Sequence, residues 1–165
     1  MKLFVLRHGM TTESITDEGR ELSAQGVVEV ENVLARRLDD LRQVNAMYSS
    51  PLLRVQQTLN IAKRVLDFRG EILESQYLKT GSRLDEIKGF VAEIDFDGGD
   101  ILVSSHQSCS SILVLWMTGE DLMISNGSLL CIEIKRLGQG GGDILWQESH
   151  NSREVKRTTN FVDQF

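Results

Sequence analysis

An α/β fold with a mostly parallel sheet is predicted by three features of the sequence. Short apolar segments alternate with longer segments of helical periodicity along most of the chain, which is typical of strands joined by helical crossovers. The segment 2–6 is almost wholly apolar and the segment 101–105 begins with Ile-Leu-Val, as expected for strands buried on both faces. The segments 128–136 and 143–148 flank a glycine-rich turn at 138–142, which predicts an antiparallel hairpin. The expected architecture is a three-layer sandwich, with helices on both faces of the sheet and the hairpin near the C-terminal end.

Two helices are predicted in the first half of the chain. The first is expected to run from an N-cap at Ser23 to about residue 41, because apolar residues recur there at helical spacing. The second is expected over 51–66. Ser50 can cap its free N–H groups, and Pro51 is tolerated in the first turn of a helix.

The remaining elements follow the same alternation. Short strands are expected at 46–49 and 71–74. Further helices are expected over 84–94 and 108–117, on either side of the buried strand at 101–105.

Length and composition are those of an ordinary globular protein. The chain has 165 residues, which suits a single domain spanning 1–165. Its formal net charge of −6 counts against a nucleic-acid partner, because such proteins normally present a basic face. An anionic substrate remains compatible with this charge, since a local cluster of arginines can oppose the global sign.

The sequence favours a cytoplasmic location without membrane insertion. The apolar residues at 1–6 are too few for a signal-peptide core, and the stretch at 112–117 is too short to cross a bilayer. Cys109 and Cys131 are far apart and show no metal-binding spacing, so they are expected to be reduced thiols.

Two histidines stand directly after the predicted buried strands. His8 follows the first strand, and His106 follows the strand at 101–105. Ligands of open α/β sheets bind beyond the carboxyl ends of the strands. If these two strands are neighbours, the imidazoles of His8 and His106 face each other across one crevice. His150 lies in a polar segment and is expected to be an ordinary surface or core residue and not a catalyst.

Three arginines are candidates for the same crevice. Arg7 precedes His8, Arg20 lies in a loop, and Arg54 falls in the first turn of a predicted helix. Guanidinium groups match phosphate oxygens two at a time, and helix N-termini add N–H donors. The pattern therefore predicts a site for a dianionic phosphoryl group.

Three segments resemble the histidine phosphatase superfamily, which includes the phosphoglycerate mutases. They are residues 6–9 (LRHG), 50–58 (SPLLRVQQT) and 105–106 (SH), in matching order and separation. The short length of the chain and residues 20–26 (RELSAQG) are most similar to the SixA group of phosphohistidine phosphatases. The similarity covers roughly the first 120 residues.

The resemblance implies a phosphatase that needs no cofactor or metal. His8 would take up the phosphoryl group, and water would then hydrolyse the phosphohistidine intermediate. Arg7, Arg54 and His106 match the phosphate-binding residues of the family, and Arg20 matches a further arginine of the SixA group. His8 must be neutral to attack, while the arginines stay charged and stabilise the transferring oxygens. His106 is expected to be protonated, and to act as a donor, when phosphate is bound.

The proton donor to the leaving group has two candidates. Glu86 lies in a Leu-x-Glu pattern like that of the mutase-like relatives, although the spacing around it also describes an ordinary amphipathic helix. Asp17 lies three residues before Arg20. An alkoxide leaving group needs such a donor, whereas the imidazole of phosphohistidine needs little help. A site without a poised carboxylic acid therefore favours phosphohistidine as the substrate.

Several functions remain open at this stage. A phosphatase for protein phosphohistidine is preferred, with a phosphatase for a small ester such as a sugar phosphate as the alternative. A mutase is disfavoured because the chain has little sequence for a capping insertion. A non-catalytic phosphate-binding module is a further alternative. Metal-dependent hydrolysis through His8 and His106 ranks last, because three nearby arginines would repel a divalent cation.

Overall fold

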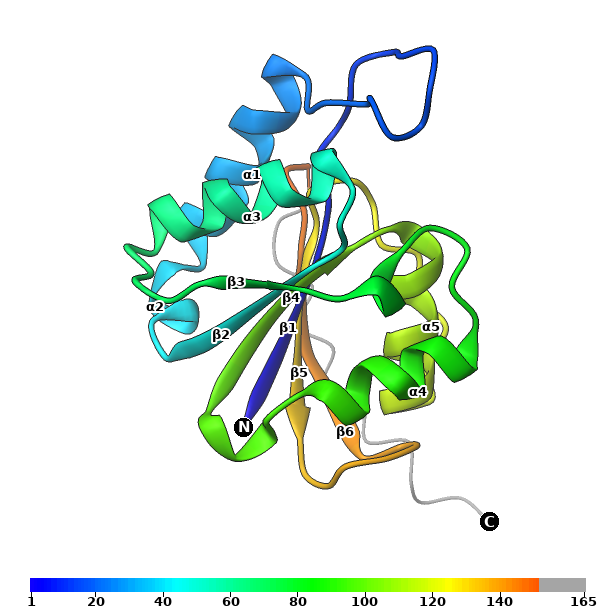
Figure 1. Ribbon diagram of the computed structural model, residues 1–165. Helices are drawn as coiled ribbons and strands as arrows, with labels where there is room; N and C mark the ends of the chain where they lie inside the picture. Colours follow the sequence, from blue (N-terminus) through cyan, green and yellow to red (C-terminus); the bar gives the residue numbers. More distant parts are fainter. Residues whose placement is uncertain (152–165) are drawn as a thin grey trace.

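A six-stranded sheet lies at the centre of the computed structural model, which describes residues 1–151 (Figure 1). In chain order the strands are β1 (Lys2–Arg7), β2 (Val44–Ser49), β3 (Ile72–Glu74), β4 (Asp100–Ser105), β5 (Leu129–Ile134) and β6 (Gly142–Glu148). The helices are α1 (Ala24–Arg36), α2 (Leu38–Leu41), α3 (Leu53–Val65), α4 (Leu84–Glu93) and α5 (Gln107–Thr118), with 3₁₀ turns at Gln76–Leu78 and Phe96–Gly98. This alternation confirms the predicted α/β class. Residues 152–165 of the expected domain lie outside the described part of the chain.

The strand order β3-β2-β4-β1-β5-β6 places the first strand inside the sheet. Strand β4 pairs in parallel with both β1 and β2, and β2 pairs in parallel with β3. Strand β5 is antiparallel to β1 and to β6, so the predicted C-terminal hairpin extends a parallel sheet. The register pairs Arg7 with Ser105 and Ser49 with Ser104. The carboxyl ends of β1, β2 and β4 therefore meet at one edge.

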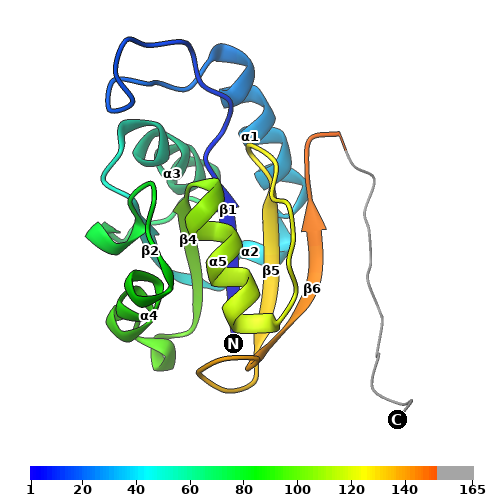
Figure 2. The same ribbon diagram turned by 90° about the vertical axis from the view of Figure 1, so that its right-hand side faces the viewer.

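Helices cover both faces of the sheet, as the sequence predicts (Figures 1 and 2). Helices α1 and α3 pack on one face, where Phe4 of β1 and Leu34 of α1 belong to one buried apolar cluster. Helices α4 and α5 cover the other face, where Leu3 of β1 packs in a second cluster with Phe90 and Val114. Adjacent residues of β1 thus serve opposite cores, because successive side chains of a strand point to opposite faces.

The helix predicted from Ser23 to about residue 41 is interrupted at Arg37, so this part of the prediction is wrong. Ser23 does cap α1, because its hydroxyl oxygen accepts a hydrogen bond from a backbone N–H of the first turn. The side chain of Arg37 lies over the Trp146 ring, 4.2 Å from its centre, and pairs with Glu148 at 2.9 Å. Both partners belong to β6, so contacts with a distant strand accompany the break between α1 and α2.

The second predicted helix starts later than expected. Helix α3 begins at Leu53, its N-cap residue is Leu52, and no side chain caps it. Pro51 therefore precedes the helix, and Ser50 is not its cap. The Ser50 hydroxyl lies 3.0 Å from Nε2 of His106 instead, and the backbone N–H of Leu52 donates to it at 3.4 Å.

Two further features bear on the expected location. No helix formed by residues 1–151 is long and apolar enough to cross a membrane. Cys109 and Cys131 are both buried and free.

Candidate active site

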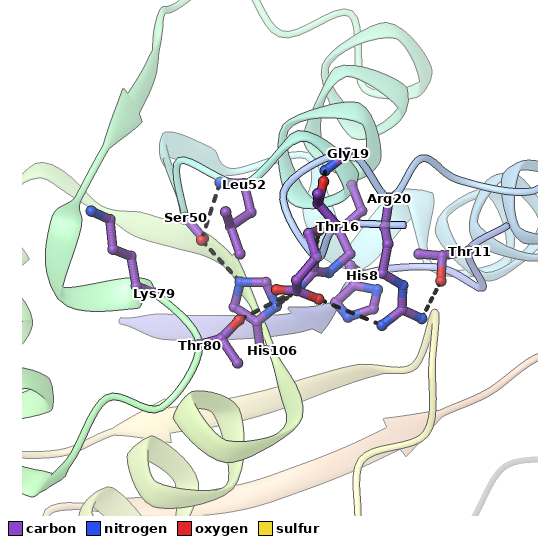
Figure 3. Close-up of polar contacts among 12 residues, drawn as sticks. His8, Thr11, Thr16, Gly19, Arg20, Ser50, Leu52, Lys79, Thr80 and His106 are labelled. Carbon is purple, nitrogen blue, oxygen red and sulfur yellow. Dashed lines mark hydrogen bonds and ion pairs between the residues drawn. The ribbon is translucent and has the colours of Figure 1, made fainter. Parts of the chain in front are cut away.

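The two predicted histidines lie together at the carboxyl edge of the sheet. His8 follows β1 and His106 follows the neighbouring strand β4, and their ring centres are 5.4 Å apart (Figure 3). The backbone N–H of His8 donates to the carbonyl of Ser105 at 3.2 Å, which continues the β1–β4 pairing into the site. The parallel register of two adjacent strands thus brings together residues that are far apart in sequence.

Within residues 1–151, Nδ1 of His8 has a hydrogen-bond partner and Nε2 has none. Its Nδ1 lies 2.8 Å from the carbonyl oxygen of Gly9, and a carbonyl can only accept. Nδ1 therefore carries the proton, and the lone pair resides on Nε2. Burial lowers the pKa of His8 to about 4; the Gly9 hydrogen bond opposes this shift, and the charges of Arg54, Arg7 and Arg20 add to it. His8 is consequently neutral near pH 7.

His106 is held by partners on both ring nitrogens. Nη2 of Arg54 donates to Nδ1 of His106 at 3.2 Å, so Nε2 carries the proton and donates to the Ser50 hydroxyl at 3.0 Å. Burial, followed by the charge of Arg54, lowers the pKa of His106 to about 3. His106 orients Arg54 in this arrangement. Its expected role as a protonated donor to phosphate stays a prediction.

Arg54 is a buried cation in the first turn of α3, where the sequence places it. Its side chain is 3% exposed, and Nη2 also donates to the Thr80 hydroxyl at 3.3 Å. Its Nε is buried and has no hydrogen-bond partner among residues 1–151. A buried N–H without an acceptor is costly, so this atom is available to an oxyanion.

Arg7 approaches the site from the end of β1. Its Nη1 donates to Oε1 of Gln107 at 2.9 Å and to the carbonyl of Ile124 at 2.8 Å. Its Nε, like that of Arg54, is buried without a partner within residues 1–151. Burial lowers the pKa of Arg7, but a guanidinium stays charged at neutral pH.

Arg20 and Asp17 reach the site from the loop before α1. Nη2 of Arg20 donates to the Thr11 hydroxyl at 2.5 Å, and Figure 3 shows Arg20 beside His8. Nη2 of Arg54 donates to Oδ2 of Asp17 at 3.0 Å, and Oδ1 of Asp17 lies 3.6 Å from Nη1 of Arg20. Desolvation raises the pKa of Asp17, but the hydrogen bond from Arg54 and the charges of Arg54 and Arg20 outweigh it and lower that pKa. Asp17 is therefore an ionised carboxylate near neutral pH.

The structure does not bring Glu86 into contact with these residues. Its side chain is exposed on α4, and Oε2 accepts a hydrogen bond from the backbone N–H of Arg83 at 2.9 Å. That contact is one half of a capping box at the start of the helix. A local helix-capping role thus accounts for the acidic residue at this position.

Several contacts around the site were not predicted. They involve Ser50 and Gln107, described above, and two residues that contact Gly9. Nδ2 of Asn126 donates to the Gly9 carbonyl at 3.4 Å. The Thr58 hydroxyl accepts a hydrogen bond from the Gly9 N–H at 3.2 Å. Ser50 and Gln107 adjoin predicted strand ends, a signal that could have identified them. Asn126 lies in a loop without periodicity, so the sequence offers no comparable signal.

A cavity of about 340 Å³ adjoins the arginine cluster. Its lining residues are Met10, Thr11, Arg20, Ser125, Asn126 and His150. His150 was expected to have a structural role only; its side chain is 28% exposed, and Nε2 lies 3.3 Å from the buried Glu29 carboxylate. This histidine therefore belongs to the surroundings of the site.

The fold and this cluster define an α/β protein with two buried histidines, one buried arginine and two partly exposed arginines at the carboxyl edge of its sheet. Residues 3–89, just over half of the chain, match the model of the histidine phosphatase superfamily (branch 1). The chain belongs to this superfamily.

Solved structures with the same fold include SixA proteins. The structure of the protein histidine phosphatase SixA complexed with tungstate has a TM-score of 0.80 and 22% identity, covering 91% of this chain and 97% of that one. A candidate phosphohistidine phosphatase SixA from Nakamurella multipartitia has a TM-score of 0.75 and 17% identity, with coverages of 92% and 96%. One from Agrobacterium tumefaciens has a TM-score of 0.75 and 16% identity, with coverages of 90% and 97%. At these identities the likeness establishes the fold. A comparison with curated protein sequences gives no match.

Proposed function

We propose that this protein hydrolyses the phosphoryl group of phosphohistidine in a partner protein, with His8 as the nucleophile. The free lone pair on Nε2 of neutral His8 suits nucleophilic attack on phosphorus. The guanidinium groups of Arg7 and Arg54, whose Nε atoms are buried without a partner within residues 1–151, would balance the charge on the phosphoryl oxygens together with Arg20. The tungstate complex of SixA, a protein of the same fold, gives a precedent for oxyanion binding.

The reaction would proceed in two displacements. In the first, the Nε2 lone pair of His8 forms a bond to phosphorus as the bond from phosphorus to the substrate imidazole breaks, and that imidazole takes up a proton from solvent water. In the second, water attacks phosphorus, loses a proton and displaces His8. The products are inorganic phosphate and the unmodified partner histidine. His8 is then neutral again for the next cycle.

The ionisation state of Asp17, the carboxylate near the site, is the observation that favours phosphohistidine as the substrate. Asp17 is the carboxylate that contacts the site arginines within residues 1–151, and it is ionised and paired with Arg54. Glu86 caps a helix. Neither is placed as a carboxylic acid for an alkoxide leaving group. The imidazole of phosphohistidine needs little such help.

A partner of this kind fits a cytoplasmic location, which we also infer. The two buried free thiols, Cys109 and Cys131, suit a reducing compartment.

A small phosphate ester is the second candidate substrate. Asp17 favours it, because displacement from Arg54 would remove the hydrogen bond that lowers the pKa of this carboxylate and so allow it to take up a proton for an alkoxide leaving group.

The test is to trap the phosphoryl group and to compare substrates. Labelled substrate quenched in base should leave acid-labile phosphate on the wild-type protein and none on His8→Ala. Hydrolysis of a phosphohistidine peptide should exceed that of a sugar-phosphate panel, and Glu86→Gln should leave the rate unchanged. Unchanged turnover in His8→Ala would contradict the mechanism, and a clear preference for an ester would contradict the proposed substrate.

A further inference from the structure

The Asp17 carboxylate contacts two of the arginines of the candidate site, Arg54 and Arg20. It takes a hydrogen bond from Nη2 of Arg54 and lies within ion-pair distance of Arg20. Those two guanidiniums are also the groups proposed to hold the phosphoryl oxygens. Asp17 takes Nη2 of Arg54 and leaves Nε unpaired within residues 1–151, so a phosphate bound to Nε would share this guanidinium with an internal anion.

The loop around Asp17 allows the side chain to move while the backbone stays in place. The base of the loop is closed by the bridge between Thr11 and Leu22 and by the hydrogen bond from Thr12 N to the Glu21 carbonyl at 2.9 Å. Nη1 of Arg54 donates to the Asp17 backbone carbonyl at 2.8 Å. The Asp17 side chain itself is 47% exposed. Rotation of that side chain towards solvent would release the carboxylate without unfolding the loop.

We propose that Asp17 is an internal competitor that weakens the binding of inorganic phosphate and so promotes release of the product. The inference rests on the proposed function, because it assigns Arg54 and Arg20 to the phosphoryl group. Its physical basis is that phosphate must either displace the carboxylate from Arg54 or bind beside a like charge. A phosphoryl group still attached to its partner protein gains further contacts from that protein. Free phosphate has none, so the same electrostatic penalty from Asp17 leaves the product more weakly bound than the substrate.

Two other roles for Asp17 predict different behaviour. If Asp17 only positions Arg54, its removal should loosen phosphate binding, and Asp17→Asn should behave like the wild type because the amide oxygen can still accept from Nη2. If Asp17 donates a proton to the leaving group, its removal should lower kcat and leave phosphate affinity unchanged.

The experiment is calorimetric titration of the full chain with inorganic phosphate at pH 7.5, together with kcat on a phosphohistidine peptide. The proteins are the wild type, Asp17→Asn, Asp17→Ala and Glu18→Gln. Glu18 is the matched control: it is exposed on the same loop, loses the same charge, and has no contact with the site arginines within residues 1–151.

We expect both Asp17 variants to bind phosphate roughly tenfold more tightly than the wild type. Glu18→Gln should stay within about twofold, because its charge is screened by solvent. Equal or weaker binding by Asp17→Asn overturns the inference, as does a fall in kcat at unchanged affinity. These outcomes are separate from the trapping of phosphate on His8, which tests the proposed function. Absence of phosphate binding in all four proteins overturns the inference, while the trapping experiment still decides the proposed function.

Discussion

Arg54 connects the parts of the candidate site. From a buried position at the start of α3, its guanidinium donates to Asp17 on the loop, to Thr80 and to His106 after β4. A planar group with donors in a fixed fork can satisfy several acceptors at once. An ammonium group carries the same charge but presents it as a point. The shape of Arg54 is therefore as important as its charge.

We predict that Arg54→Lys lowers kcat/KM by about a hundredfold or more, the cost found when one preorganised donor to a developing anion is removed. Arg64→Lys is the matched control, because Arg64 lies on the same helix, is largely exposed and pairs with Glu31. Steady-state kinetics on one substrate checks both variants. Similar kinetics for the two variants would show that charge alone suffices at Arg54.

Among single residues, the site members that can be predicted from the sequence are those that stand at the ends of strands or the starts of helices. His8, His106 and Arg54 come together because two strand ends and a helix start are recognisable from periodicity. The position of Asp17 over Arg54 depends on how the preceding loop folds back. Loops carry no periodic signal, so the charge state of Asp17 required the structure.

At the scale of elements, α1 packs tightly against the turn that follows His8. A β-carbon on Gly26 would collide with the backbone of Met10, and one on Gly9 would lie 2.9 Å from Cγ2 of Val30. The missing side chains allow the helix to approach the segment that carries the nucleophile. Gly26 is thus kept within a helix despite its low helix propensity.

We predict that Gly26→Ala destabilises the protein by about 1–3 kcal/mol, although glycine to alanine within a helix normally stabilises. Backbone atoms form the obstacle at Gly26 and cannot move aside cheaply. Gly89→Ala on α4 is the control: there the nearest atoms belong to the ring of Tyr77, which is 39% exposed and can shift. Urea unfolding of both variants measures the difference. A stability gain in Gly26→Ala would show that α1 and the turn after His8 leave room for a β-carbon at this position.

Element boundaries show where local patterns stop being sufficient. The apolar strands were located to within a residue or two, because burial on both faces leaves a nearly continuous apolar run. The break at Arg37 accompanies contacts with Trp146 and Glu148, which are more than a hundred residues away. Ser50 was expected as a helix cap because its residue type suits that role. Its hydroxyl instead contacts His106 from a neighbouring strand end.

At the scale of the whole molecule, the candidate site makes stability depend on pH. The pKa of His8 is about 4 and that of His106 about 3 in the folded protein, against about 6.5 for histidine in an unfolded chain. Between these values the unfolded state binds protons that the folded state does not. The free energy of unfolding therefore falls as pH drops below about 6.5, and this loss ends only near the folded-state pKa values.

We predict that each histidine contributes a loss of about 1–2 kcal/mol between pH 7 and pH 5, because both rings are buried. For a chain of this size, each kcal/mol lowers Tm by roughly 2–4 °C. Most of the loss from Asp17 falls below this range, because its lowered pKa makes the carboxylate titrate at more acidic pH. Thermal unfolding of the wild type and of His8→Asn/His106→Asn at both pH values provides the test, in acetate and MES buffers to avoid stabilisation by phosphate. The double variant should show a clearly smaller drop in Tm, whatever its stability at pH 7. An equal drop in the two proteins would place the acid sensitivity outside the candidate site.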